Sequence, residues 1–365
     1  MTDKIRVGII GANANYGWSK RAHLPALLGM PDFELTAVCT SRPETAEESK
    51  AFYGAKLAFH DYTDMSNHPD VDLVVVSVSV PAHYGMVNAG LQAGKHVFCE
   101  WPLGANTGEA VELAALARDK GVRTLIGLQA RGGPALLRLR ELVSEGYVGE
   151  MLACNMTMFL PGLLQRGADR AWMADRAKGA NTLSIASGHA LDIFCHCVGE
   201  FRELTAQVSV QLGQWQTGDG KTVDVDAADN VVVSGTLENG AAASAHIATI
   251  PWSGSGWRME VYGTEGTLSA RSEEMVQYGN VHLYGAQGAG QALQPLEVPA
   301  RLSLAPEGVP PGEPYNVAQL YHIIGDAIRN GGEPQPDFDA AVARHRFLDL
   351  LQQSSDEGRR VAVSN

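Results

Sequence analysis

A glycine-rich segment near the N-terminus has the residue types that can hold a dinucleotide phosphate. It runs from Gly11 to Gly17, between an apolar stretch at residues 5–10 and a helical pattern at residues 20–28. Glycines at such a turn let backbone N–H groups approach a pyrophosphate at the positive end of the helix. The spacing departs from G-x-G-x-x-G, because Asn13 stands at the second position and one extra residue precedes Gly17. In its strand–turn–helix context, the segment predicts nucleotide binding.

The end of the second predicted strand carries residues that could select between NAD and NADP. Domains that prefer NAD place an Asp or Glu there, which accepts a hydrogen bond from the ribose 2′-hydroxyl. Here the residues are Thr40, Ser41 and Arg42, and none of them is acidic. Hydroxyl groups and a guanidinium suit the 2′-phosphate of NADP. The sequence therefore favours NADP over NAD, with a solvated loop role for Arg42 as the alternative.

The cysteines indicate neither a metal site nor a disulfide framework. In Cys195-His196-Cys197 the two thiols point in different directions on a helix, and no second Cys/His cluster completes a tetrahedral site. We assign no metal to the chain. The cysteines are odd in number and scattered, as in a reducing compartment. They are Cys39, Cys99, Cys154, Cys195 and Cys197.

The elements that must position these residues begin with an alternating α/β pattern. Strands are expected at residues 5–10, 34–39, 72–80, 96–99 and 123–128. Helices are expected at residues 20–28, 44–52, 83–93 and 104–120. This alternation predicts a doubly wound parallel sheet with helices on both faces. Such domains bind ligands beyond the carboxyl ends of their strands, where the glycine segment falls.

After about residue 129 the pattern changes to that of an α+β domain. Strands are expected at residues 151–158, 203–212, 230–237, 242–250, 257–262 and 266–270. Asn239-Gly240 is a strong signal for a two-residue hairpin turn, so the large open sheet should be mainly antiparallel. Helices are expected at residues 134–145, 316–330 and 338–359. We therefore expect a Rossmann domain at 1–130 and a substrate and dimerisation domain at 131–365, whose last helix packs back toward the first domain.

The bulk composition excludes two classes of partner. The net charge of -13 over 365 residues argues against nucleic acid, because a phosphate-binding surface needs a surplus of Lys and Arg. No run of about 18 apolar residues is present, so no membrane span is expected. The N-terminus enters a strand without the apolar region of a signal peptide. A cytoplasmic protein with a small-molecule substrate is the expectation.

Three further segments resemble a known family. They are Val80-Pro81-Ala82-His83, residues 93–102 with the sequence AGKHVFCEWP, and residues 187–192 with the sequence SGHALD. With the glycine segment, they resemble the glucose–fructose oxidoreductase, inositol dehydrogenase and rhizopine-catabolism (Gfo/Idh/MocA) family. The resemblance implies a tightly held nicotinamide cofactor, NADP or NAD, and a carbohydrate-like substrate. It also implies a homodimer or homotetramer formed through the open sheet of the second domain.

The chain departs from the catalytic pattern of that family. Its members use a Lys in Glu-Lys-Pro and an Asp four residues before a His. Here Trp101 stands at the Lys position and Ile185 at the Asp position, whereas His189 is retained. The resemblance makes His189 the general acid/base, with Lys178 as a further catalytic candidate. Helical spacing would let Asp192 orient the imidazole, and a packing role for His189 is the alternative.

The resemblance also implies two sets of binding residues. Those expected at the cofactor are Gly11, Asn13, Ala14, Asn15, Tyr16, Gly17, Trp18, Thr40, Ser41, Arg42, Ser79, Val80, His83, Glu100, Trp101, Pro102 and Gln129. Those expected at the substrate are Trp101, Arg131, Trp172, Arg176, Asn181 and His189. Trp101 would give a sugar an aromatic wall to stack on.

The departures resemble one subgroup of the family. The lengthened glycine segment, Glu100-Trp101, Gln129-Ala130-Arg131 and Ser187-Gly188-His189 are similar to the subgroup that contains the fungal galactose-regulon repressor. Two functions therefore stay open. The first is an NADP- or NAD-dependent oxidoreductase acting on a sugar-like molecule, and the second is a non-catalytic, dinucleotide-binding regulator. A redox-assisted lyase or glycosidase is a third reading that no acid–base pair singles out.

Overall fold

The structure of the chain is a computed structural model that describes residues 4–162, 165–250 and 252–363. The chain divides into two units, one of residues 1–129 with 304–343 and one of residues 130–303 with 344–365. The expected domains, 1–130 and 131–365, divide the chain only once. The units differ from them because residues 304–343 return to the first unit.

Six parallel strands form the sheet of the first unit, which confirms the predicted Rossmann architecture. Their order is β3-β2-β1-β4-β5-β6, and every neighbouring pair is parallel. The strands are β1 (Ile5–Ile10), β2 (Phe33–Cys39), β3 (Leu57–Phe59), β4 (Leu73–Val76), β5 (His96–Glu100) and β6 (Thr124–Gly127). Strand order reverses between β1 and β4. The crevice beyond their carboxyl ends is thus the switch point where such sheets bind ligands.

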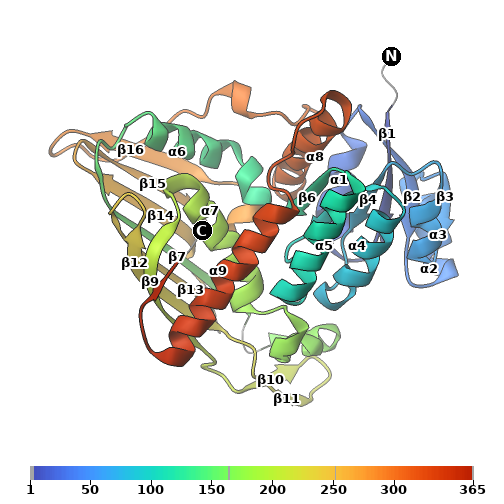
Figure 1. Cartoon of the computed structure of the whole chain (residues 1–365), viewed down its shortest axis with the longest axis horizontal. Helices are drawn as coiled ribbons and strands as arrows, with labels where there is room; N and C mark the ends of the chain where they lie inside the picture. The colour runs from blue at the N-terminus through green and yellow to red at the C-terminus, as the bar shows by residue number, and fades with distance from the viewer. Residues whose placement is uncertain (1–3, 163–164, 251, 364–365) are drawn as a thin grey trace. The chain divides into compact units, whose positions relative to one another are not determined.

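Five helices connect these strands, and a sixth, α8, joins them from the C-terminal part of the chain (Figure 1). They are α1 (Leu24–Leu28), α2 (Pro43–Tyr53), α3 (Tyr62–Asn67), α4 (His83–Gln92), α5 (Thr107–Lys120) and α8 (Glu313–Asn330). Local sequence fixes the ends of α5, because the Asn106 side chain accepts a hydrogen bond from Glu109 N–H and Gly121 adopts a φ of +63°. A π-helical turn, Ser19–His23, precedes α1 directly after the glycine segment. Such turns are frequent at functional sites.

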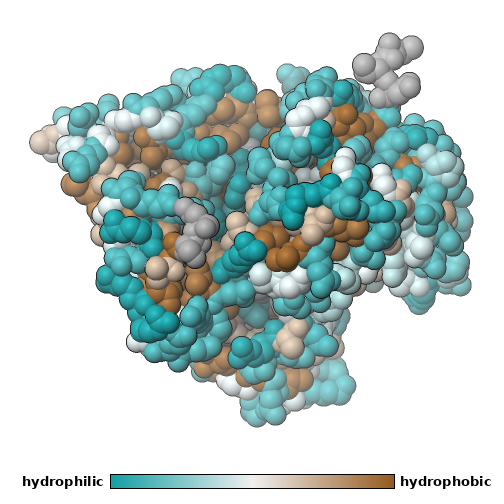
Figure 2. Space-filling view, in the orientation of Figure 1, coloured by the Kyte–Doolittle hydropathy of each residue, from teal (hydrophilic) through white to brown (hydrophobic). Residues whose placement is uncertain are grey.

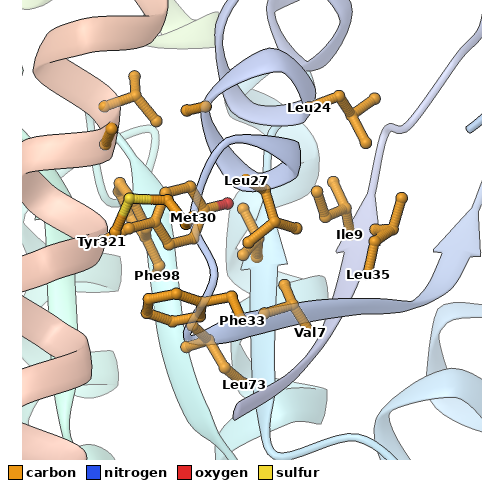
Figure 3. Close-up of a cluster of buried hydrophobic side chains, with 14 of the residues drawn as sticks. Val7, Ile9, Leu24, Leu27, Met30, Phe33, Leu35, Leu73, Phe98 and Tyr321 are labelled. Atoms are coloured by element: carbon orange, nitrogen blue, oxygen red, sulfur yellow. The ribbon is translucent and has the colours of Figure 1, made fainter. Parts of the chain in front are cut away.

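The core of the first unit includes a helix from the far end of the chain (Figure 3). Tyr321 of α8 is fully buried, and its ring lies edge-on to Phe33 at 5.4 Å and to Phe98 at 5.3 Å between centroids. Gly325 lets α8 approach closely, since a Cβ there would lie 2.7 Å from the Phe33 ring. The apolar face of the parallel sheet is therefore completed by residues more than half the chain away.

Nine strands form the sheet of the second unit, in the order β17-β16-β15-β14-β7-β13-β12-β9-β18. All neighbouring pairs are antiparallel except β13 with β7. This confirms the large, mainly antiparallel sheet predicted from the sequence. The strands are β7 (Met151–Pro161), β9 (Phe201–Ser209), β12 (Asn230–Leu237), β13 (Ala242–Ile250), β14 (Gly256–Gly263), β15 (Gly266–Ser272), β16 (His282–Gln287), β17 (Gln294–Pro295) and β18 (Val361–Ala362).

One face of this large sheet is covered and the other is open. Helices α6 (Pro134–Ser144) and α7 (Ser187–Val198) pack against strands of the sheet. On β13 and β14, Ala245, Trp257 and Met259 are buried, whereas their neighbours His246 and Arg258 line a depression of about 510 Å³ on the open face. This alternation follows the two-residue period of a strand. The last long helix, α9 (Phe338–Glu357), begins in the first unit and ends in the second.

A small sheet that the sequence did not predict extends from the second unit. It has the order β11-β10-β8, with the strands β8 (Gln165–Arg166), β10 (Gln214–Thr217) and β11 (Thr222–Asp224). It has its own apolar cluster, in which Trp215 packs with Ala174, Val225 and Ala227. These strands are too short for a two-residue period to be recognised in the sequence.

The visible surfaces of both units are mostly hydrophilic, and smaller hydrophobic patches are scattered over them (Figure 2). Among the described residues, no helix is both long enough and apolar enough to span a bilayer. Exposed aromatic side chains include Tyr16, Phe52 and Trp252.

Replacement of Trp257 tests the packing of the covered face. Trp257 is fully buried, whereas Trp252 is 76% exposed. Trp257→Ala should lower the free energy of unfolding by about 3–5 kcal/mol, because it removes a large buried side chain and leaves a cavity. Trp252→Ala should change it by less than about 0.5 kcal/mol. Urea unfolding followed by circular dichroism measures both, and equal effects would contradict this packing.

Candidate functional site

The backbone at Gly11 passes through a space that admits no side chain. Its N–H donates to the Cys39 carbonyl at the end of β2, at 2.9 Å. Its φ is +92°, and a Cβ there would lie 2.1 Å from the carbonyl oxygen of Ser77, just beyond β4. Gly17 also has a positive φ, +101°, but its Cβ position is open. The glycine segment therefore crosses the switch point, as predicted.

Hydrogen bonds hold the tip of the glycine segment against α2. The Asn13 carboxamide oxygen accepts from Asn15 N–H at 2.8 Å, and Tyr53 O–H donates to the Asn13 carbonyl at 3.1 Å. The Asn15 carboxamide donates to Glu48 at 3.1 Å. Asn13 thus shapes the turn that a second glycine usually makes, which explains how the loop tolerates the altered spacing. Asn15 and Tyr16 are exposed at the tip.

The three residues after β2 differ in what their side chains contact. Thr40 is buried, and its hydroxyl lies 2.7 Å from the Thr45 hydroxyl and donates to the Arg42 carbonyl at 3.1 Å. Ser41 and Arg42 are exposed, and Arg42 is the N-cap residue of α2. Among the described residues, the Arg42 guanidinium forms no ion pair. Ser41 and Arg42 are therefore the members of this set whose side chains are accessible to a ligand.

Glu100 and Gln129, both expected at the cofactor, bind each other. The Gln129 carboxamide donates to the Glu100 carboxylate at 2.7 Å. The other Glu100 oxygen lies 2.7 Å from His23 Nε2, and His23 Nδ1 lies 3.0 Å from the Tyr321 hydroxyl. This buried network joins β5, the π-helical turn and α8. Trp101, the expected stacking wall, is buried with 4% of its surface exposed.

His83, also expected at the cofactor, acts as a link between two loops. Its Nδ1 lies 2.7 Å from the Pro102 carbonyl oxygen and its Nε2 lies 3.1 Å from the Val78 carbonyl oxygen. Burial lowers the pKa of this imidazole. Both ring nitrogens therefore contact backbone carbonyls that follow β4 and β5. Of the other expected residues nearby, Ser79 is exposed and Val80 is buried.

In the second unit, His189 lies in the first turn of α7. It is buried, with 5% exposed. The π-helical turn Thr182–Ala186 leads into α7, and Asn181 caps that turn. The Asn181 carboxamide oxygen accepts from Leu183 N–H at 2.9 Å and Ser184 N–H at 3.1 Å. The side-chain oxygen of Asn181, expected at the substrate, is therefore used in shaping the helix that carries His189.

Asp192 differs from the expectation that it orients His189. Arg131 donates to both of its carboxylate oxygens, at 2.8 and 2.6 Å, and Arg344 Nε donates at 3.3 Å. Burial alone would raise the pKa of Asp192, but the two guanidinium charges outweigh burial and lower it. Arg344 also donates to Glu200 at 2.9 Å. Arg131, expected at the substrate, is thus engaged in an ion pair that fixes α7.

The remaining candidates lie on short helical turns. Trp172 lies in the turn Ala168–Ala174 and is half-buried. Arg176 and Lys178 lie in the turn Arg176–Lys178 and are exposed. Neither cation forms an ion pair with any residue that the structure describes. Their side chains are accessible, but nothing in their contacts gives them a catalytic role.

The described ranges contain no group of three or more His, Cys, Asp or Glu side chains that could hold a metal ion. All five cysteines are free thiols and buried. Burial raises the pKa of the Cys197 thiol to about 12, so this residue is an uncharged packing group at neutral pH. Sequence reasoning missed His23, Tyr321 and Arg344, because each acquires its polar partner from a distant part of the chain.

Two families match successive parts of the chain. Residues 5–128 match the GFO/IDH/MocA oxidoreductase family, which has an NAD-binding Rossmann fold. Residues 134–272 match the family of the Gal80p C-terminal domain. The first match covers the parallel sheet, and the second covers β7 to β15.

Curated relatives include proteins of both kinds that the sequence left open. Dehydrogenase aclE of Aspergillus oryzae is 36% identical over 216 residues, which are 58% of this chain and 59% of that protein. The galactose/lactose metabolism regulatory protein GAL80 of Saccharomyces cerevisiae is 28% identical over 256 residues, which are 65% of this chain and 58% of that protein. Both alignments span less than two thirds of the relative.

A solved structure shares the whole fold. Levoglucosan dehydrogenase in complex with NADH and levoglucosan has a TM-score of 0.87 and 22% identity, and the match covers 100% of both chains. At this identity the similarity establishes the fold alone.

Substitution of Gly11 tests the loop as a dinucleotide site. Gly11→Ala should weaken binding of NADPH or NADH at least about tenfold, because the added Cβ meets the Ser77 carbonyl and displaces the loop. Gly121→Ala is the matched control and should leave the affinity unchanged, since Gly121 also has a positive φ but has an open Cβ position and lies outside the glycine segment. Titration of nicotinamide fluorescence measures both. Equal affinities for Gly11→Ala and wild type would contradict a binding site at this loop.

Substitution of Asp192 tests the buried ion pairs. Asp192→Asn should lower the free energy of unfolding by about 3–5 kcal/mol at pH 7, because it removes the buried carboxylate that Arg131 and Arg344 share and leaves Arg344 with Glu200 alone. The pKa of Asp192 is lower in the folded state than in the unfolded chain, where it is about 3.9. The wild-type advantage should therefore be complete above about pH 5 and shrink as the pH falls below 4.

The control for Asp192→Asn is the exposed carboxylate Asp119. Asp119→Asn should change the free energy of unfolding by less than about 0.5 kcal/mol. Denaturant unfolding at a series of pH values gives both results. A pH-independent difference between Asp192→Asn and wild type would contradict a role for the carboxylate charge.

Proposed function

Because the chain belongs to the Gfo/Idh/MocA oxidoreductase family and carries a C-terminal domain of the Gal80p type, we propose that it is an NAD(P)-dependent oxidoreductase. The proposed reaction moves hydride between a nicotinamide and a hydroxyl, hemiacetal or carbonyl carbon of a sugar-like molecule. The observation that carries the proposal is the crossing of the switch point by the backbone at Gly11. Backbone amides at that point of a doubly wound sheet can approach a pyrophosphate.

The residues at the loop fit a nicotinamide dinucleotide. Asn15, Tyr16 and Gly17 are exposed, so the backbone at the tip is accessible to phosphate oxygens. The residues that would hold the cofactor are Gly11, Asn13, Ala14, Asn15, Tyr16, Gly17 and Trp18, with Ser79 and Val80 beyond β4. When bound, the nicotinamide supplies or accepts the hydride.

NADP is the preferred cofactor in this proposal. Ser41 and Arg42 are exposed beyond β2, and no carboxylate stands among residues 40–42 to accept from a 2′-hydroxyl. The Arg42 guanidinium has no ion-pair partner among the described residues, so it is available to a 2′-phosphate. Thr40 contributes to the shape of this turn through its hydroxyl rather than through a ligand contact.

His189 is the proposed general acid/base. It would take the proton of the substrate hydroxyl in oxidation and return it in reduction. Asp192 does not assist it directly, because Arg131 and Arg344 hold the carboxylate. The proposed role of Asp192 is to fix the register of α7, so that His189 keeps one position. Lys178 and Arg176 are accessible, and their proposed role is limited to substrate contact.

A second candidate function is a dinucleotide-binding regulator without catalysis. The match of residues 134–272 to the Gal80p C-terminal domain favours it. The replacement of the usual catalytic Lys and Asp by Trp101 and Ile185 favours it too, because neither side chain moves a proton. A regulator would bind dinucleotide with the same loop but would show no turnover.

The proposed assembly is a homodimer or homotetramer formed through the open face of the large sheet. That face is continuous over β7, β12, β13 and β14 and carries mostly short polar side chains around its depression. A second sheet could pack on such a face beside Arg258 and Glu260, whose side chains hydrogen-bond to each other. The five free thiols agree with a cytoplasmic location, because reduced cysteines persist in a reducing compartment.

Turnover by the purified chain separates the two functions. NADP or NAD is added with a panel of sugars, polyols and hydroxy acids, and absorbance of the reduced nicotinamide is followed. His189→Ala should lower kcat about 10²–10⁴-fold, because the substrate loses its proton acceptor. Cofactor affinity should stay unchanged.

The matched control is His282→Ala, at an exposed histidine of the same unit. It should leave kcat and KM at the wild-type values. Tight cofactor binding without turnover over the whole panel would overturn the oxidoreductase and favour the regulator.

A further inference from the structure

The segment between β7 and α7 has a charge balance opposite to that of the chain. Residues 165–178 contain four basic side chains and two acidic ones, whereas the whole chain has a net charge of -13. The basic residues are Arg166, Arg170, Arg176 and Lys178. Within the described ranges, none of these four cations forms an ion pair. This segment is therefore a locally basic region of an acidic protein.

Arg166 is the member of this set that is held in place and partly buried. It lies in β8, where it pairs with Thr217 of β10, and its carbonyl accepts from Gly218 N–H at 2.9 Å. Its guanidinium lies 4.6 Å from the ring centroid of Trp215, a side chain that is only 3% exposed. The Arg166 Nε is buried without a hydrogen-bond partner in the part of the chain that the structure describes.

The acidic side chains of the neighbouring turns contact other groups. Asp175 accepts from Ala177 N–H at 2.9 Å, and Asp226 accepts from Arg176 N–H at 2.7 Å. The Asp169 carboxylate lies over Gly167, where an added Cβ would be 2.3 Å from its oxygen. No carboxylate among the described residues therefore neutralises Arg166.

The environment of Arg166 disfavours its positive charge. Burial lowers the pKa of its guanidinium, and the like charge of Arg170 lowers it further. A partly buried charge normally has a partner, because removal from water without one is unfavourable. Contact with the face of Trp215 offsets part of this cost but leaves the buried Nε without an acceptor.

We propose that Arg166 and Arg170 form a binding site for a small oxyanion group, a carboxylate or a phosphate, with Trp215 as its apolar wall. The planar fork of an arginine places parallel N–H donors toward two oxygens of such a group. The second guanidinium contributes charge from the adjoining turn, Ala168–Ala174. The ligand supplies the acceptor that Arg166 lacks and the negative charge that the segment lacks. The site requires neither the dinucleotide loop nor His189.

The main alternative is a purely structural role, in which the guanidinium only packs on Trp215. In that case Arg166 would contribute to stability, but no anion would bind. Arg170 separates the two cases, because it is exposed and its removal leaves the contact with Trp215 intact.

The test is isothermal titration of the full chain with three probes at saturating NADPH, which keeps the probes away from the dinucleotide loop. The probes are inorganic phosphate, gluconate and glucose. Saturable binding of phosphate, gluconate or both that depends on Arg166 and Arg170 is the expected result, and any binding of neutral glucose should be independent of both arginines. A preference for one of the two anions identifies the source of the oxyanion as a phosphorylated or a carboxylated molecule.

The variants are Arg166→Met and Arg170→Met, with Arg202→Met as the control at an exposed arginine of β9 that has no ion pair in the described ranges. Each of the first two should weaken anion binding at least tenfold, and the control should not change it. If Arg166→Met does not fold, Arg170→Met alone decides the result. Absence of saturable anion binding by wild type, or equal binding by wild type and Arg170→Met, would overturn the site. Because no turnover is measured, failure of the proposed oxidoreduction leaves this result readable.

Discussion

The carbonyl oxygen of Ser77 and the backbone of Gly11 approach so closely that no side chain fits between them. This contact joins the ends of β1 and β4, the two strands at which the order of the parallel sheet reverses. The Gly11 N–H adds a bond to the end of β2, so three strand ends converge on one glycine. The accessible tip at Asn15 and Tyr16 is presented from this fixed base. Cofactor binding, and every step of chemistry proposed after it, depends on that constraint.

In the second unit, a buried carboxylate holds the elements of the site in place. Asp192 receives donors from Arg131 and Arg344, which come from opposite ends of that unit in sequence. The ion pairs fix α7, and with it the position of His189. In the first unit, Glu100 fills a similar place by joining β5 to residues from two other elements. Polar residues that a sequence suggests as ligand-binding residues can thus serve to join helices and strands.

Sequence patterns predicted the elements whose formation depends on neighbouring residues. The strands at residues 230–237 and 242–250 were predicted with the observed bounds, because their alternation is regular and Asn-Gly joins them. Helical spacing predicted that Asp192 orients His189. In the structure its carboxylate contacts Arg344, which lies 152 residues away in sequence and could not be recognised as a partner. The packing of Tyr321 into the first core was missed for the same reason. Long-range partners leave no local period or spacing for a single sequence to display.

The most direct test of the central claim is the ratio of the dissociation constants of NADPH and NADH for wild type and Arg42→Ala. Arg42 is exposed, so the substitution should leave the fold intact. Wild type should bind NADPH about tenfold or more tightly than NADH, and Arg42→Ala should remove most of that difference, since the 2′-phosphate loses its guanidinium partner. If neither dinucleotide binds, the dinucleotide site is contradicted. If the ratio is the same in both proteins, the selection of NADP by Arg42 is contradicted.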